Sequence, residues 1–264
     1  MHPILFILIL SLICSAVLSV MIGNLWLFLS MFFGFVFIFS ILLWLFFALL
    51  SAIIPKGKYY SKPSAFYLWN LNLAYAFVCG GAGAKIRTRG LEKLPDKPFL
   101  LVSNHLSQLD NMIQSLVLRK RKIAFIAKEQ LFKIPIVRGI ITRCCYIPIG
   151  RKSTKSDRHA IEIAEDYINR GVMSIGVYPE GHRSKDGQLQ KFQAGCFKIA
   201  LDTGCPIVVS AVIGTDEVHK RFPLGRTEVR FDIIDVIDPA GRKSVEISEE
   251  IHEIIKKYIE ENKK

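Results

Sequence analysis

Charged side chains are missing from residues 1–55, because no lysine, arginine, aspartate or glutamate precedes Lys56. The whole formal net charge of +12 therefore lies in the rest of the chain. Such an excess favours anionic partners, namely nucleic acid, phosphorylated metabolites or an acidic membrane surface. The adjoining apolar segment favours the membrane. Nucleic acid is the weakest of the three, since no aromatic platform is interleaved with the basic residues.

Two kinds of short motif are also missing. None of the six cysteines forms a CxxC pair, so neither a disulfide framework nor a zinc site is indicated, and a reducing cytosolic compartment is the simpler interpretation. No Gly-x-Ser-x-Gly stretch occurs, which removes the usual signature of a serine nucleophile. The cysteines are small apolar residues in this interpretation. They are Cys14, Cys79, Cys144, Cys145, Cys196 and Cys205.

Residues 3–54 are almost entirely apolar and are interrupted only near Gly23–Asn24. Ile4–Ile22 would form a helix of ~28 Å and Leu25–Ile54 one of ~45 Å, at ~1.5 Å per residue. We therefore predict a membrane-embedded helical hairpin over residues 1–55, which either spans the bilayer or dips into one leaflet. A cleaved signal peptide is the alternative, but the segment lacks a charged start and a clear small-x-small site.

Basic residues follow the apolar segment directly. Lys56, Lys58 and Lys62 flank its exit, and a second basic cluster lies at residues 85–93. This asymmetry predicts a cell-membrane protein with its globular part on the cytoplasmic side. The intervening residues 56–84 are rich in aromatics, which fits an interfacial helix and linker on the bilayer. A core helix of the globular part fits this stretch equally well.

Residues 85–264 alternate between strand-like and helical patterns, which is typical of an α/β domain. Helices are predicted after Ser107, near Ser156, at about Gly195–Asp202 and at about Ser244–Asn262, while Arg151–Arg158 is interpreted as a loop. The predicted strands are Phe99–Val102, Ile123–Ala127, Cys144–Ile149, Met173–Tyr178, Pro206–Ile213 and Val229–Ile234.

A histidine and an aspartate stand five residues apart where one predicted strand ends. The apolar run stops at Ser103–Asn104, and His105 and Asp110 follow. On a continuous helix the two side chains would lie ~140° apart, so they can meet only if the chain bends between them. Ser107-x-x-Asp110 is also a capping box, in which Asp110 would only satisfy backbone N–H groups. Both roles are compatible, because a carboxylate has several acceptor positions.

Basic side chains follow other predicted strands. Tyr178–Ser184 contains a Pro-Glu-Gly turn, in which Gly181 separates Glu180 from Arg183. An arginine in such a turn suits a phosphate monoester, although a surface ion pair between Glu180 and Arg183 is the simpler explanation. Lys128 and Arg151 likewise come after strand-like runs. In a parallel sheet all these positions would gather at one edge.

The stretches that carry these side chains are Asn104–Asp110, Ile149–Arg151 and Tyr178–Ser184, and an apolar stretch, Cys205–Val209, follows them. Together they resemble the four ordered blocks of the 1-acylglycerol-3-phosphate acyltransferases, over about Ile86 to Thr215. The resemblance implies a glycerolipid acyltransferase-like α/β fold with a mixed, largely parallel sheet flanked by helices. It also implies transfer of an acyl group from acyl-ACP or acyl-CoA to the sn-2 hydroxyl of lysophosphatidic acid, giving phosphatidic acid.

Some positions depart from the family's usual pattern. His182 stands where threonine is usual and Tyr178 where phenylalanine is usual. Leu106 and Gln108 replace glutamine and tryptophan, and Val209 occupies a position often held by proline. The predicted catalytic residues are all retained. The departures therefore bear on which acceptor is used and not on the type of reaction.

On this resemblance and the basic strand ends, we expect His105 to act as a general base that Asp110 orients, without an acyl-enzyme. Arg183 is expected to bind the acceptor phosphate with Lys128 and Arg151, and Glu180 and Gly181 to support the cluster. No cofactor or metal is expected beyond the acyl thioester co-substrate. Two alternatives stay open: an acyltransferase for another lysolipid or glycerol 3-phosphate, and a non-catalytic membrane lipid-binding protein.

Overall fold

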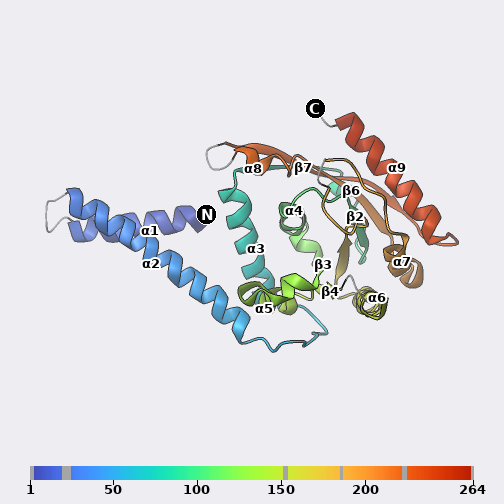
Figure 1. Ribbon diagram of the computed structural model, residues 1–264, viewed down its shortest axis with the longest axis horizontal. Coiled ribbons are helices and arrows are strands. Elements are labelled where there is room, and N and C mark those ends of the chain that lie inside the picture. The colour runs from blue at the N-terminus through green and yellow to red at the C-terminus, as the bar shows by residue number, and fades with distance from the viewer. Residues whose placement is uncertain (1–2, 20–24, 151–153, 185–186, 222–224, 263–264) are drawn as a thin grey trace.

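A seven-stranded sheet forms the centre of the molecule, with the strand order β1-β7-β6-β2-β5-β3-β4 (Figure 1). The computed structural model describes residues 3–19, 25–150, 154–184, 187–221 and 225–262. β2 to β6 run parallel to one another, whereas β7 is antiparallel to β6 and parallel to β1. The strands are β1 (Ala84–Arg89), β2 (Leu100–Ser103), β3 (Ile123–Lys128), β4 (Ile147–Ile149), β5 (Ser174–Val177), β6 (Ile207–Ile213) and β7 (Thr227–Ile237).

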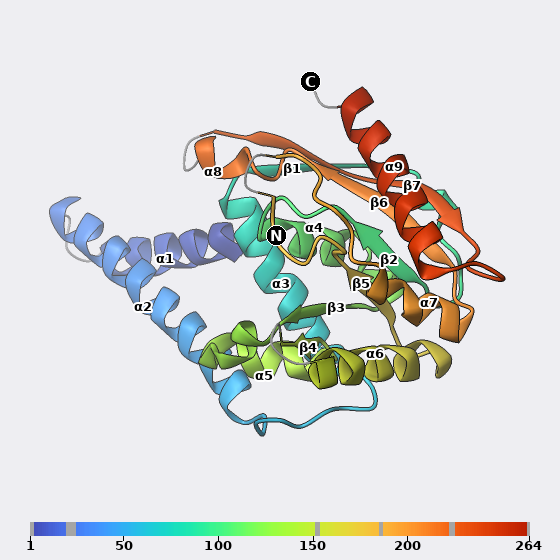
Figure 2. The same cartoon turned by 45° about the vertical axis from the view of Figure 1, so that its right-hand side comes forward.

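Helices cover both faces of the sheet, which explains why β2 and β5 are buried along their whole length. Figure 2 shows α3, α4 and α5 on one side and α6, α7 and α9 on the other. These helices are α3 (Ala65–Gly81), α4 (Leu109–Val117), α5 (Pro135–Arg143), α6 (Thr154–Asn169), α7 (Lys198–Thr203) and α9 (Ser244–Asn262), with α8 (Val218–Arg221) between β6 and β7. Short 3₁₀ turns are η1 (Leu91–Lys93), η2 (Arg119–Arg121), η3 (Glu129–Lys133) and η4 (Ala194–Phe197). The predicted mixed, largely parallel α/β fold is confirmed.

One strand was missed, one predicted strand is too long, and one loop prediction is wrong. β1 was not predicted, because its basic residues alternate along an edge strand that is mostly exposed and resemble a simple charge cluster. The predicted strand Cys144–Ile149 is shorter, since Cys144 and Cys145 form the turn after α5, where Cys145 has a φ of 63°. The predicted loop Arg151–Arg158 is helical from Thr154 onward.

The N-terminal helices α1 (Pro3–Ser19) and α2 (Leu25–Ala52) pack against each other and extend away from the sheet (Figure 1). Within the described part of the chain, α2 alone is long and apolar enough to cross a membrane, and that apolar stretch is not buried. The predicted break at Gly23–Asn24 lies outside the described residues. Exposing this apolar surface to water would cost a large free energy. The two helices therefore favour an apolar environment.

The C-terminal end of α2 is docked on α5. The Gly139 N–H donates to Ser51 Oγ at 2.8 Å, and the Arg138 guanidinium donates to the Ile54 carbonyl oxygen at 2.8 Å. Gly139 is required here, because a Cβ at this position would lie 2.2 Å from the Ser51 carbonyl oxygen. Tyr67 of α3 adds a hydrogen bond to the Leu50 carbonyl oxygen at 3.0 Å. The apolar helix is thus joined to the globular part by packed backbone and not only by the linker.

Helix α3 packs one face against α4 and α5, which buries Tyr67, Leu71 and Tyr75. The core-helix interpretation therefore holds for this face. Phe66 and Trp69 remain 51% and 62% exposed on other faces. An interfacial position for these two aromatics stays a prediction.

Candidate active site

The strand ends that carry the predicted site residues lie next to one another. β2 pairs with β5, β5 with β3, and β3 with β4, all in parallel. Their carboxyl ends therefore meet at the same edge of the sheet, which is where open α/β sheets place their ligands. His105 follows β2, Glu180 follows β5 and Lys128 ends β3.

Asn104 determines how the chain leaves the sheet after β2. Its side-chain amide donates to the Val212 carbonyl oxygen at 2.9 Å and accepts from the Val212 N–H at 2.8 Å. A side chain thus forms the next pair of hydrogen bonds to β6 in place of the backbone. The main chain is freed to turn, and His105 enters the loop between β2 and α4.

His105 and Asp110 are brought together as the sequence predicted. The distance between His105 Nδ1 and Asp110 Oδ2 is 2.7 Å, and the chain bends between the two residues before α4 begins at Leu109. The Asp110 side chain is fully buried, whereas the His105 side chain is 19% exposed. Because the carboxylate accepts at Nδ1, the neutral ring carries its proton there and presents the lone pair of Nε2.

Asp110 also organises the loop around the histidine. Its Oδ2 accepts from the backbone N–H groups of Leu106 and Ser107 at 2.7 and 2.8 Å. Its Oδ1 accepts from the hydroxyl of Thr215, just beyond β6, at 2.5 Å. A buried carboxylate is tolerated when its acceptor positions are filled in this way. Asp110 therefore binds the histidine and backbone N–H groups at the same time, but the predicted capping box is not formed, because the N-cap of α4 is Gln108 and makes no side-chain cap hydrogen bond.

The backbone of His105 is held from the turn after β5. Glu180 Oε1 accepts the His105 N–H at 2.6 Å, Glu180 Oε2 accepts the Gln190 N–H at 2.9 Å, and the Ser184 N–H donates to the His105 carbonyl oxygen at 2.9 Å. Burial raises the pKa of the Glu180 carboxyl, and the two backbone N–H groups partly oppose this effect. The alternative of a surface ion pair between Glu180 and Arg183 is not observed among the described residues, and Glu180 makes these backbone contacts instead.

The aromatic residue before this turn touches the histidine itself. The ring of Tyr178 stacks on that of His105, with centroids 4.1 Å apart and planes inclined by 15°. Its hydroxyl donates to Gln114 Oε1 of α4 at 3.0 Å. One ring face of His105 is therefore covered by the chain that follows β5.

The remaining predicted residues make no described contact with the His105 side chain. Gly181 has a φ of 70°, which permits the tight turn between Glu180 and Arg183, and Arg183 is exposed. Lys128 is partly buried at the end of β3. Arg151 lies outside the described residues, although β4, which precedes it, ends at the same edge.

The described residues contain no group of three or more His, Cys, Asp or Glu side chains that could hold a metal ion. The site thus offers a partly exposed histidine, a buried carboxylate and exposed positive charge. Such a set of side chains can remove a proton from a hydroxyl group that is held near an anionic group.

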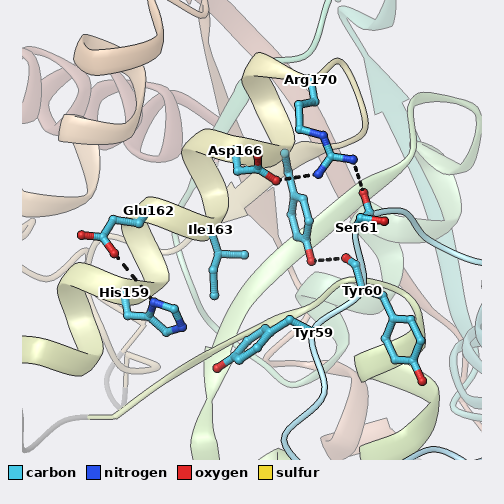
Figure 3. Close-up of a pocket in the computed structure, with 9 residues that line it drawn as sticks. Tyr59, Tyr60, Ser61, His159, Glu162, Ile163, Asp166 and Arg170 are labelled. Atoms are coloured by element: carbon cyan, nitrogen blue, oxygen red, sulfur yellow. Dashed lines mark hydrogen bonds and ion pairs between the residues drawn. The ribbon is translucent and has the colours of Figure 1, made fainter.

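A separate hollow of about 290 Å³ lies between the linker after α2 and helix α6 (Figure 3). Its contacts are internal to the chain: the Tyr167 hydroxyl donates to the Tyr60 carbonyl oxygen at 2.7 Å, and Arg170 bridges Asp166 and the Ser61 carbonyl oxygen. None of the His105 contacts involves this hollow. We therefore locate the site at the strand edge and not in this cavity.

Sequence reasoning missed Asn104, Thr215 and Tyr178 as members of the site. Asn104 and Tyr178 stand directly beside predicted site residues, so their position in the motifs was an available signal. Thr215 lies 105 residues from Asp110 in the chain, and no local pattern marks it. Only the pairing of β2 with β6 brings it into place.

Comparison with known proteins relates the chain to acyltransferases. Residues 85–213 match the family model described as Acyltransferase. A chloroplastic 1-acyl-sn-glycerol-3-phosphate acyltransferase of Brassica napus is 35% identical over 136 residues, which is 51% of this chain and 39% of the relative. A 1-acyl-sn-glycerol-3-phosphate acyltransferase of Borreliella burgdorferi is 31% identical over 136 residues, or 54% of its length. The chain therefore matches less than two thirds of these curated relatives.

A solved structure resembles a larger part of the chain. The 1-acyl-sn-glycerophosphate (LPA) acyltransferase PlsC from Thermotoga maritima superposes with a TM-score of 0.57 at 29% identity. The match covers 86% of this chain and 97% of that one, so it includes more than the region of the family model.

The hydrogen bond between Thr215 and Asp110 gives a test of the site's architecture. Thr215→Val keeps the shape of the side chain but removes a donor from a buried carboxylate. We expect the free energy of unfolding to fall by ~1–3 kcal/mol. Thr203→Val is the matched control, because the Thr203 hydroxyl donates to the Ile199 carbonyl oxygen of its own helix. Denaturant unfolding followed by circular dichroism in detergent compares the two, and equal losses would contradict the special role of Thr215.

Proposed function

Because the chain belongs to the acyltransferase family, we propose that it transfers a fatty acyl group from an acyl thioester to the sn-2 hydroxyl of 1-acylglycerol 3-phosphate, giving phosphatidic acid. The observation that carries this proposal is the hydrogen bond between His105 and the buried Asp110 at the edge of the parallel strands. The acceptor and the reaction class are those for which the relatives are named.

In the proposed reaction Nε2 of His105 takes the proton of the acceptor hydroxyl as its oxygen attacks the thioester carbonyl carbon. The new ester bond forms, the carbon–sulfur bond breaks, and the proton leaves with the thiolate as a thiol. A hydroxyl has a pKa far above neutrality, so its proton must be removed during the attack. The thiolate is a good leaving group, so much of the rate comes from positioning the two substrates.

Asp110 supports this chemistry in two ways. It keeps the proton of the neutral ring on Nδ1, which leaves Nε2 free to accept, and its negative charge stabilises the imidazolium that forms. Its other hydrogen bonds, from Leu106, Ser107 and Thr215, hold the carboxylate in place while the charge on His105 changes.

The acceptor phosphate is assigned to Arg183, with Lys128 and Arg151 assisting. Arg183 is exposed in the turn whose backbone also holds His105, through Ser184 and Glu180. Glu180 is occupied by backbone N–H groups, so it does not neutralise Arg183. An arginine fork in this position suits a phosphate monoester.

The lipid substrate requires access from a membrane. The exposed apolar surface of α1 and α2 supports insertion of residues 1–55 into the bilayer, with the globular part on the cytoplasmic side where the basic clusters lie. Residues 56–84 then lie at the interface. No cofactor is needed beyond the donor, and either acyl carrier protein or coenzyme A, both acidic, suits the charge of +12.

The general-base role predicts that His105→Ala abolishes turnover while leaving the protein folded. We expect kcat to fall by a factor of ~10³ or more, as general-base loss combines with misorientation of the acceptor. Formation of labelled phosphatidic acid from lysophosphatidic acid, assayed with acyl-ACP and with acyl-CoA, measures this loss and identifies the donor. His159→Ala on α6 is the matched control and should keep wild-type turnover. Near-normal product from His105→Ala would reject the mechanism, and an inactive wild type would favour a lipid-binding protein.

The phosphate assignment predicts that Arg183→Ala mainly raises KM for lysophosphatidic acid. A charged hydrogen bond contributes about 1.5–3 kcal/mol, which corresponds to a rise of ~10–100-fold. The control is Arg119→Ala, because Arg119 is also exposed but precedes β3 at the opposite edge of the sheet. Steady-state kinetics with varied acceptor distinguishes them; an unchanged KM in Arg183→Ala would remove the assignment.

The membrane assignment predicts that the full chain resists extraction with alkaline carbonate. Trypsin should cut at the lysines of residues 56–62 in inside-out vesicles, because this linker is then exposed. Right-side-out vesicles should protect it. Release of the full chain by carbonate, or cleavage in right-side-out vesicles, would show that insertion or sidedness is wrong.

A further inference from the structure

Three aromatic rings form a continuous stack that ends at His105. The His105 ring lies on Tyr178 with centroids 4.1 Å apart, and Tyr178 lies on Phe125 with centroids 5.8 Å apart and planes inclined by 11°. The three residues come from the loop after β2, the position directly after β5 and the middle of β3. The stack thus extends from the sheet interior to the candidate base.

One hydrogen bond does not fix the plane of an imidazole ring. The bond from Nδ1 to Asp110 places one ring atom, but the ring can still swing about that contact and change the direction of Nε2. A flat surface against one ring face removes this freedom. Tyr178 provides such a surface, since its plane is inclined by only 15° to that of His105.

Helix α4 holds Tyr178 as well as Asp110. The Tyr178 hydroxyl donates to Gln114 Oε1 at 3.0 Å, and Gln114 is fully buried one helical turn after Asp110. Burial raises the pKa of Tyr178 well above its ordinary value, so the phenol keeps the proton that it donates. Both constraints on the histidine therefore start from the same rigid helix.

The far side of the stack depends on the absence of a side chain at Gly176. This residue pairs with Phe125 across β5 and β3, and a Cβ on it would lie 2.3 Å from Phe125 Cε1. The ring of Phe125 therefore occupies the space that any other residue would fill. This close approach explains a glycine inside a buried strand and gives Tyr178 a fixed support.

We propose that Tyr178 is a positioning residue, whose ring fixes the plane of His105 and thereby aims Nε2 at the acceptor hydroxyl. The proposal rests on the proposed function in one respect, namely that His105 is the base. When His105 takes the proton, the resulting cation lies on the electron-rich face of Tyr178, which also favours the transition state. The ring performs this role, and the hydroxyl group secures the ring through Gln114.

Two substitutions at Tyr178 separate positioning from stability. Tyr178→Phe keeps the stacked ring but leaves the buried Gln114 oxygen without its donor; we expect a melting temperature lower by ~2–8 °C and kcat within ~3-fold of wild type. Tyr178→Leu removes the flat surface, and we expect kcat to fall ~10–100-fold with KM for lysophosphatidic acid unchanged. A merely structural tyrosine would instead make kcat follow the melting temperature.

Tyr167 provides the matched control. It is a buried tyrosine on α6 whose hydroxyl donates to the Tyr60 carbonyl oxygen at 2.7 Å, and none of its described contacts involves His105. Tyr167→Leu should lower the melting temperature while leaving kcat near the wild-type value. Wild-type kcat in Tyr178→Leu, or equal losses of kcat in Tyr178→Phe and Tyr178→Leu, would overturn the proposal.

A spectroscopic measurement tests the positioning without turnover. In protein labelled with [¹⁵N]histidine, the His105 resonances are identified by their loss in His105→Ala. We expect the Nδ1–H order parameter of His105, from ¹⁵N relaxation, to stay high in the wild type and in Tyr178→Phe and to fall in Tyr178→Leu, because the hydrogen bond to Asp110 alone leaves the ring plane free. Equal order parameters in all three would overturn the proposal even if the chain acts on another acceptor. If Tyr178→Leu does not fold, Phe125→Leu, which removes the far support, takes its place with the same expected fall.

Discussion

The architecture of the site depends on burying one negative charge, that of Asp110, at the edge of the sheet. An isolated carboxylate in this position would cost several kcal/mol, and the cost is offset only when donors surround it. The donors come from the loop after β2 (Leu106 and Ser107), from His105 and, through Thr215, from the chain after β6. The loop conformation, the helix start and the pairing of β2 with β6 must therefore all be correct before the charge is accommodated.

The same constraint explains why the turn after β5 belongs to the site. Glu180 and Ser184 bind the backbone of His105 from both sides of the peptide chain, at the N–H and at the carbonyl oxygen. The carboxylate of Glu180 therefore acts on the position of the histidine and not on the charge of Arg183. Asp110 and Glu180 thus both form hydrogen bonds with the chain around His105, and in the described part of the chain neither carboxylate pairs with Arg183.

Structure could be predicted from the sequence where it depends on residues that are close together in the chain. The bend between His105 and Asp110 followed from the 3.6-residue repeat of a helix, and α9 followed from apolar residues at a spacing of four, of which Ile247, Ile251 and Ile255 are buried. Thr215 and β1 could not be found in this way, because their roles arise from pairing between distant segments. Cys144 and Cys145 misled for another reason: an apolar run fits a strand, but Cys145 has the positive φ of the turn that ends α5, where the Tyr146 N–H donates to the Ile141 carbonyl oxygen.

The contact between Gly139 and Ser51 has a consequence for how the molecule works with lipid. Backbone of α5 lies directly against backbone of α2, and α5 connects β3 to β4 at the edge that carries Lys128. If α2 lies in a bilayer, as proposed, this contact would hold the edge at a constant height relative to the lipid head groups. In this arrangement the depth of the reacting hydroxyl is a property of the fold itself. Lipids whose hydroxyl lies at another depth would be rejected by geometry, before any side chain recognises them.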